Sequence, residues 1–289
     1  WDNNGYDFQG QVAASRDRSE GTGADGWGAI ALGGKRSGWF RAELKGEMYS
    51  RDFAINALGF QRRNSYYQPY GRIQLLTEKP RRFLRKDSFS IDWWGQWNLD
   101  HVGLEKGLML STQHQFTNYW TLTSSLTHNF RAKDDLDTRG GPLIARVPGA
   151  DYRVKIESDT RPKANGWLEV QWKDNEAGST WRAVGGGLNL RLSSAVEIQL
   201  RPRYQWAFND AQWVQNADVD QDGTDDRFVY GQLRSKTMDL PMRANFTFRH
   251  NVSLEAFVQP FVAVGDYENF KELARPGAYE FAPYTLGDN

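Results

Sequence analysis

Apolar and polar side chains alternate along most of this chain with a period of two residues. From Val196 to Phe208 every even-numbered residue is apolar or aromatic, and the odd-numbered residues from 197 to 205 are all charged or amide side chains. The same alternation recurs in the stretches 40–48, 238–248 and 254–264. Successive side chains of a strand point to opposite faces, and a helical period of 3.6 does not imitate this pattern. The sequence therefore predicts strands that have one apolar and one polar face.

Such stretches give about thirteen strands and no convincing helix. The predicted strands are residues 6–15, 26–35, 38–50, 64–77, 86–98, 102–117, 119–131, 151–160, 165–175, 180–193, 195–208, 236–250 and 252–267. Several of them are about twice as long as the strands of ordinary globular proteins. Because no linker or shift in composition separates them, residues 1–289 are predicted to form a single all-β domain.

The connections between the predicted strands are sorted by length. Those after the second, sixth, eighth, tenth and twelfth strands are tight, whereas those after the first, third, seventh, eleventh and thirteenth are long and polar or irregular. The short turn "LDHV" after the fifth strand is an exception. Transmembrane β-barrels have short periplasmic turns and long extracellular loops, and soluble sandwiches and propellers have no reason for this sorting. We therefore expect a transmembrane antiparallel up-and-down β-barrel.

The charged faces of the strands support this expectation. A soluble barrel would have to bury one of its two faces, and a row such as Arg41, Glu43 and Lys45 is too costly to bury. In a membrane barrel the apolar face contacts lipid and the charged face lines water. In the eleventh strand, Arg201 and Arg203 are then expected inside the barrel. The lipid-facing row predicted for this strand is Val196, Ile198, Leu200, Tyr204 and Trp206.

Aromatic residues near the strand ends, such as Tyr119 and Trp120, suit the girdles at membrane interfaces. A soluble sandwich with these aromatics in its core is the alternative, and strand length and the charged second face argue against it.

Composition excludes several classes of protein. The chain has 36 Lys and Arg against 36 Asp and Glu, so no general affinity for nucleic acid is implied. The absence of cysteine excludes disulfides, thiolate metal sites and a cysteine nucleophile. A mean hydropathy of −0.71, without a run of 18 apolar residues, excludes a helical membrane span.

Four stretches resemble one known family. "LEAFVQPFVAVGDYENFKELARPGAYEF", "TRPKANGW", "NALGFQRRN" and "RGGPLIARVPG" are similar to the C-terminal barrel of the family called domain of unknown function 5916. In that family a domain similar to carbohydrate-binding module family 9 precedes a large outer-membrane barrel. The resemblance, with the odd strand count, implies a single outer-membrane barrel domain truncated at both ends, part of a larger even-numbered barrel.

The resemblance and the strand pattern together suggest a function. They imply an integral outer-membrane β-barrel of a Gram-negative-type bacterium that acts as a pore, a transport or export component, or the membrane half of an envelope complex. The alternative is a membrane anchor for a cell-surface carbohydrate-binding or carbohydrate-processing protein. The expected partners are outer-membrane lipid, lipopolysaccharide and other envelope proteins. The sequence contains no catalytic constellation, so whether the full protein is an enzyme stays open.

One acidic run is a candidate calcium site, although the fold requires no cofactor. In "DVDQDGTDD" alternate carboxylates precede a glycine, a pattern that can wrap Ca²⁺ in oxygen ligands. The candidate ligands are Asp218, Asp220, Asp222, Thr224 and Asp226. The EF-hand template asks for Glu at the twelfth position, which is Val229 here. The alternative is a solvated acidic turn.

Two connections are too apolar for free loops: Asn56–Asn64 and Arg139–Gly149. Each is expected either to fold inward and constrict the lumen or to pack outside against a neighbouring loop.

Overall fold

The computed structural model describes residues 5–17, 24–55, 61, 63–218 and 227–284, and all regular structure in this part of the chain is β. The strands are β1 (Tyr6–Asp17), β2 (Ala24–Lys35), β3 (Phe40–Tyr49), β4 (Tyr66–Thr77), β5 (Leu84–Asn98), β6 (Gly103–Phe116), β7 (Thr121–Asn129), β8 (Ala132–Asp134), β9 (Ile144–Arg146), β10 (Gly149–Glu157), β11 (Ala164–Asn175), β12 (Thr180–Arg191), β13 (Val196–Leu200), β14 (Arg203–Ala217), β15 (Arg227–Asp239), β16 (Met242–Arg249), β17 (Val252–Val258), β18 (Phe261–Leu273) and β19 (Phe281–Pro283).

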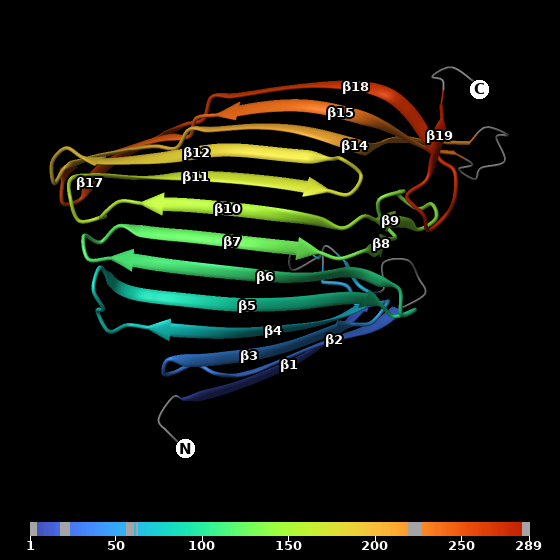
Figure 1. The fold of residues 1–289 in the computed structure, drawn as a ribbon, viewed down its shortest axis with the longest axis horizontal. Coiled ribbons are helices and arrows are strands. Elements are labelled where there is room, and N and C mark those ends of the chain that lie inside the picture. The colour runs from blue at the N-terminus through green and yellow to red at the C-terminus, as the bar shows by residue number, and fades with distance from the viewer. Residues whose placement is uncertain (1–4, 18–23, 56–60, 62, 219–226, 285–289) are drawn as a thin grey trace.

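One large antiparallel sheet contains all of these strands except β8 and β9, which pair with each other. Each strand from β1 to β7 pairs with the next, β7 pairs with β10, and the order continues through β11 and β12 (Figure 1). Connections of two to six residues lie at one edge of the sheet, and the long connections 50–65, 130–148 and 218–226 lie at the other, where the four-residue connections 99–102 and 176–179 are exceptions to the predicted sorting. We call these edges the turn edge and the loop edge.

Three of the thirteen predicted strands are interrupted by proline. β13 and β14, β15 and β16, and β17 and β18 are successive halves of single passes, separated at Pro202, Pro241 and Pro260. Proline cannot donate a hydrogen bond to the ladder. Beyond β12 each pass is therefore split into two strands of the same sheet: β13, β16 and β17 pair on the turn-edge side of the prolines, and β14, β15 and β18 pair on the loop-edge side.

The connection around the acidic run is shorter than predicted. β14 extends to Ala217 and β15 begins at Arg227. The alternation instead predicts that one strand ends at 208 and the next begins at 236. Two irregularities in the β14–β15 pairing, at Asn209–Gln212 and Trp213–Gln215, explain the error. A bulge shifts the parity of the side chains, so the period-two pattern is lost while the backbone pairing continues.

The sheet is open in the described part of the chain. Among the described residues, the register pairs β1 only with β2, and β17 only with β16. β18 pairs with β15 and, over Lys271–Leu273, with β19. The structure therefore confirms the all-antiparallel β fold, without a pairing between the first and last passes that would close a barrel.

The register confirms the predicted separation of the two faces. One cross-strand row on the outward face is Val154, Val170, Val184, Tyr204, Met238 and Val262. The inward face carries cross-strand ion pairs, including Arg153 with Glu169 at 2.9 Å and Lys173 with Asp151 at 2.8 Å. Arg201 donates to Gln199 Oε1 at 3.1 Å, which places it on the inward side of its strand as predicted.

Aromatic side chains cover glycines on neighbouring strands. A Cβ atom added to any of these glycines would overlap the ring of its directly paired aromatic residue. The pairs are Gly28 with Tyr49, Gly33 with Phe8, Gly71 with Trp93, Gly107 with Trp94 and Gly187 with Trp167. This arrangement explains Gly187, the last of three successive glycines at 185–187 inside β12, by close packing rather than by ligand binding.

We expect Gly187→Ala to destabilise the fold, because the new methyl group must displace the Trp167 indole. Overpacking of this kind costs about 1–3 kcal/mol, and the urea midpoint of unfolding should fall accordingly. Gly46→Ala is the matched control, since no atom lies within 4 Å of its added Cβ. Equal midpoints for the two variants would contradict the aromatic–glycine packing.

Candidate functional site across the inward face

The segment 130–148 is an insertion in a hairpin. β7 ends at Asn129 and β10 begins at Gly149, and these two residues pair directly with each other. The intervening residues leave the sheet and fold over its inward side at the loop edge. They include the short hairpin β8–β9, in which Ala132–Asp134 pair with Ile144–Arg146 (Figure 1). We call residues 130–148 the inserted segment.

Two carboxylates of the inserted segment bind distant parts of the sheet. Asp135 forms an ion pair with Arg63, just before β4, and the Tyr230 hydroxyl of β15 donates to Asp137 at 2.9 Å. The ladder from β4 to β15 runs through β5, β6, β7, β10, β11, β12 and β14. Eight strand spacings would separate these residues by roughly 38 Å in a flat sheet. The sheet must therefore curve around the inserted segment.

Burial is concentrated where the inserted segment docks. Ile144 and Thr138 are buried, and Tyr230 is fully buried on the other side of the contact. Asn216 of β14 donates to the Thr138 carbonyl at 3.0 Å. Arg139 lies over the ring of Trp213, with its guanidinium carbon 3.5 Å from the ring centroid. The segment is thus held by apolar burial, hydrogen bonds and a cation–π contact.

The chain around 274–284 covers the other side of the inserted segment. The Gly277 amide donates to the Leu143 carbonyl, and the Ala145 amide donates to the Ala278 carbonyl at 3.3 Å. This covering stretch is anchored by Tyr279, whose hydroxyl donates to Asp210 at 3.0 Å. Burial, with the nearby Asp210 carboxylate, raises the pKa of the Tyr279 phenol, so the phenol remains a hydrogen-bond donor at physiological pH.

Two cavities lie on the inward face beside the inserted segment. One has a volume of about 580 Å³ and faces β10–β12, and the other has a volume of about 810 Å³ and faces β3–β5. Leu104, Glu105 and Arg146 line both of them. Arg146 is fixed between the cavities, because its Nε lies 3.2 Å from Asp134 and its Nη1 donates to the Leu104 carbonyl at 3.4 Å.

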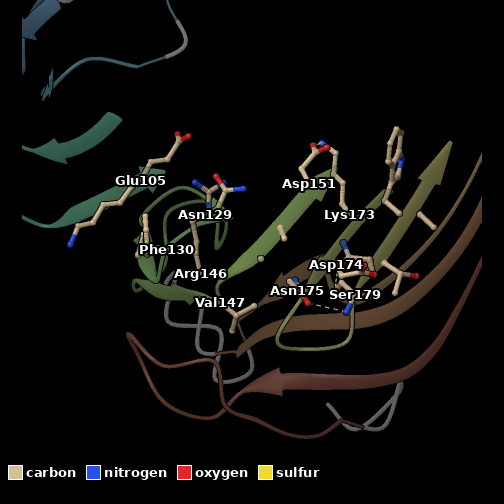
Figure 2. A pocket seen from close by; sticks show the side chains of 18 of the residues that line it. Glu105, Asn129, Phe130, Arg146, Val147, Asp151, Lys173, Asp174, Asn175 and Ser179 are labelled. Atoms are coloured by element: carbon tan, nitrogen blue, oxygen red, sulfur yellow. Dashed lines mark hydrogen bonds and ion pairs between the residues drawn. The ribbon is translucent and has the colours of Figure 1, made fainter. Parts of the chain in front are cut away.

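The cavity walls are polar and internally paired. In the 580 Å³ cavity, Asp151 accepts from Lys173, and Asn175 closes the adjoining turn by accepting from the Ser179 amide at 2.9 Å (Figure 2). Glu105 accepts from the indole of Trp94 at 2.8 Å. Charges of both signs therefore lie beside one another on the described walls of these cavities.

The structure tests the sequence predictions for sites only in part. Asp218 follows the end of β14, whereas Asp220, Asp222, Thr224 and Asp226 lie outside the described residues, so the calcium site stays a prediction. Among the residues that the structure describes, no group of three or more His, Cys, Asp or Glu side chains is arranged to hold a metal ion. The described part of the chain likewise holds no helix with the length and hydropathy that a membrane crossing requires.

Of the two apolar connections, Arg139–Gly149 lies on the inward side, as one of the two expectations proposed. Most of Asn56–Asn64 lies outside the described residues. The sequence did not identify the residues that receive the inserted segment, Tyr230, Trp213 and Arg63. The only feature of the sequence that could have indicated them is that each is a large side chain near the loop edge.

The chain belongs to the family described as Domain of unknown function (DUF5916), which it matches over residues 2–288. Neither curated proteins nor solved structures give a match.

We expect Tyr230→Phe to loosen the inserted segment. The substitution removes a hydrogen bond to a carboxylate, worth about 1.5–3 kcal/mol, so cleavage by trypsin after Arg139 should accelerate roughly ten- to hundredfold. Mass spectrometry of the fragments gives the rate at this one bond. Tyr204→Phe, on the outward face, is the control and should leave the rate unchanged. Identical rates for both variants would show that the hydroxyl does not hold the segment.

Proposed function

We propose that this chain forms part of the wall of an outer-membrane β-barrel that acts as a pore or transport component. Its outward face would contact lipid, its inward face would line an aqueous passage, and the inserted segment would narrow that passage. The observation that carries the proposal is the separation of apolar and charged rows through the long antiparallel strands.

The dimensions of the outward face support the proposal. The outward series from Val184 on β12 to Leu192, the residue directly after this strand, covers eight residue steps, or roughly 26 Å of extended chain. The apolar band of outer-membrane barrels is about 25 Å tall, and a tilted strand crosses it with 9–11 residues.

The band ends at the loop edge in a row of aromatic and cationic side chains. The row in register is Tyr152, Trp172, Arg182, Trp206 and Lys236. Such side chains place an apolar body in the membrane and a polar tip in the headgroup region.

The unpaired sides of the two outermost strands support closure of the sheet into a barrel in the membrane. The outer edges of β1 and β17 carry rows of backbone groups without a strand partner in the described residues. An unpaired backbone group in hydrocarbon costs several kcal/mol. We infer that both edges are paired within a complete barrel.

We expect Leu200→Arg to destabilise the lipid-inserted protein by about 2–4 kcal/mol if the residue lies near the midplane, because the cation would face lipid. Gln199→Arg is the matched control, since Gln199 lies on the inward face beside Arg201. Urea unfolding of both variants in lipid vesicles measures the difference. Equal losses would contradict the assignment of the outward face to lipid.

Excision of the inserted segment tests the constriction. Replacing residues 130–148 by Asn-Gly should preserve the β7–β10 pairing, because Asn129 and Gly149 are already paired and this dipeptide suits a two-residue hairpin. Single-channel conductance in planar bilayers should increase. Tyr230→Phe, which retains the segment, should give an intermediate value. The constriction is contradicted if excision leaves the conductance of the wild type unchanged.

A further inference from the structure

The turn edge of the sheet is rich in cations. It consists of the connections 36–39, 78–83, 117–120, 158–163, 192–195 and 250–251, which lie opposite the inserted segment (Figure 1). These connections contain six Lys or Arg residues but only two carboxylates, although the whole chain is neutral. The cations are Arg36, Lys79, Arg81, Arg82, Arg161 and Lys163, and the carboxylates are Glu78 and Asp159.

Two of these six cations are neutralised within the chain. Arg36 lies 2.9 Å from Asp7 and 3.5 Å from Glu43. Arg161 lies 2.6 Å from Asp159, and the hydrogen bonds that it donates lower the pKa of this carboxyl to about 2, so the pair persists at physiological pH.

The other four cations have no such partner. Lys79, Arg81, Arg82 and Lys163 are exposed, and none has a carboxylate within ion-pair distance in the part of the chain that the structure describes. One further guanidinium, that of Arg85, stacks on the Tyr119 ring nearby at 3.8 Å from its centroid and adds to the positive field of this edge.

Large apolar side chains are exposed on the same turns. Trp39 is 71% exposed, Phe83 61%, Leu192 59% and Trp120 42%. Each of them belongs to a different turn. Leu192 continues the outward apolar series of β12. An apolar fringe that follows the rim of a lipid-facing surface fits a membrane interface better than a compact protein contact.

We propose that the turn edge binds the phosphate headgroups of anionic phospholipid in the leaflet that it faces. Lys79, Arg81, Arg82 and Lys163 would contact the phosphates, while Trp39, Phe83, Trp120 and Leu192 enter the acyl boundary. This inference deepens the proposed function and rests on it, because it requires the outward face to lie in lipid. At the loop edge, by contrast, four exposed arginines are each paired with a carboxylate: Arg16, Arg51, Arg131 and Arg275.

Quenching of tryptophan fluorescence by brominated lipids tests the inference. The full chain is reconstituted in phosphatidylcholine vesicles that contain either brominated phosphatidylglycerol or brominated phosphatidylcholine. Wild type should select phosphatidylglycerol by at least about fivefold, since one basic residue near an anionic surface contributes about that factor. The selectivity should fall toward one when Lys79→Gln, Arg81→Gln, Arg82→Gln and Lys163→Gln are combined. High salt should weaken it in the wild type.

The matched control removes four exposed cations from the loop edge instead: Arg16→Gln, Arg51→Gln, Arg131→Gln and Arg275→Gln. It should retain the selectivity of the wild type. Equal quenching by the two brominated lipids in the wild type, or the same selectivity in both fourfold variants, would overturn the inference and leave the membrane-spanning function standing. Absence of quenching by either lipid would overturn both.

Discussion

The curvature of the sheet depends on how the inserted segment is held. Asp135 and Asp137 are two residues apart, yet they bind Arg63 and Tyr230, which a flat sheet would separate by eight strand spacings. Right-handed twist alone gives a long antiparallel sheet some coil. The inserted segment adds a fixed support on the inward side, and the fully buried Thr138 and Tyr230 lie at this contact. The two cavities beside this segment are a consequence of the same curvature.

The two ends of the sheet differ in chemistry as well as in loop length. At the loop edge, Asp210 accepts from Lys271, Gln232 and Tyr279, so opposite charges are matched within the protein. At the turn edge, cations remain without carboxylate partners while apolar side chains project beside them. A chain with no net charge can therefore carry a polarised distribution of charge. In a membrane, such a distribution would distinguish the two leaflets, which is why the pore and the lipid interface are parts of one proposal.

Much of the fold was predictable because alternate side chains of a strand face the same environment, so their polarity follows a two-residue period. The series Val196, Ile198 and Leu200 identified its strand and its outward face, and the register confirms both. The errors have local physical causes. Proline at 202, 241 and 260 divides three passes without breaking their alternation, and bulges near Asn209 and Trp213 conceal the continuation of β14. The inward course of Arg139–Gly149 was one of two expectations, because apolar composition requires cover without specifying which surface provides it.

The sequence by itself determined the antiparallel β fold, the two faces of each strand and the grouping of short turns at one edge. These properties follow from nearest neighbours, namely the two-residue period and the turn chemistry between adjacent strands. Only the tertiary structure decided that Arg63, Asp135, Asp137 and Tyr230 meet, and that two cavities flank the inserted segment. The Arg63–Asp135 and Asp137–Tyr230 contacts join residues 72 and 93 positions apart in the chain, and no periodicity specifies such partners. They form because a curved sheet brings its distant strands to the same buried segment.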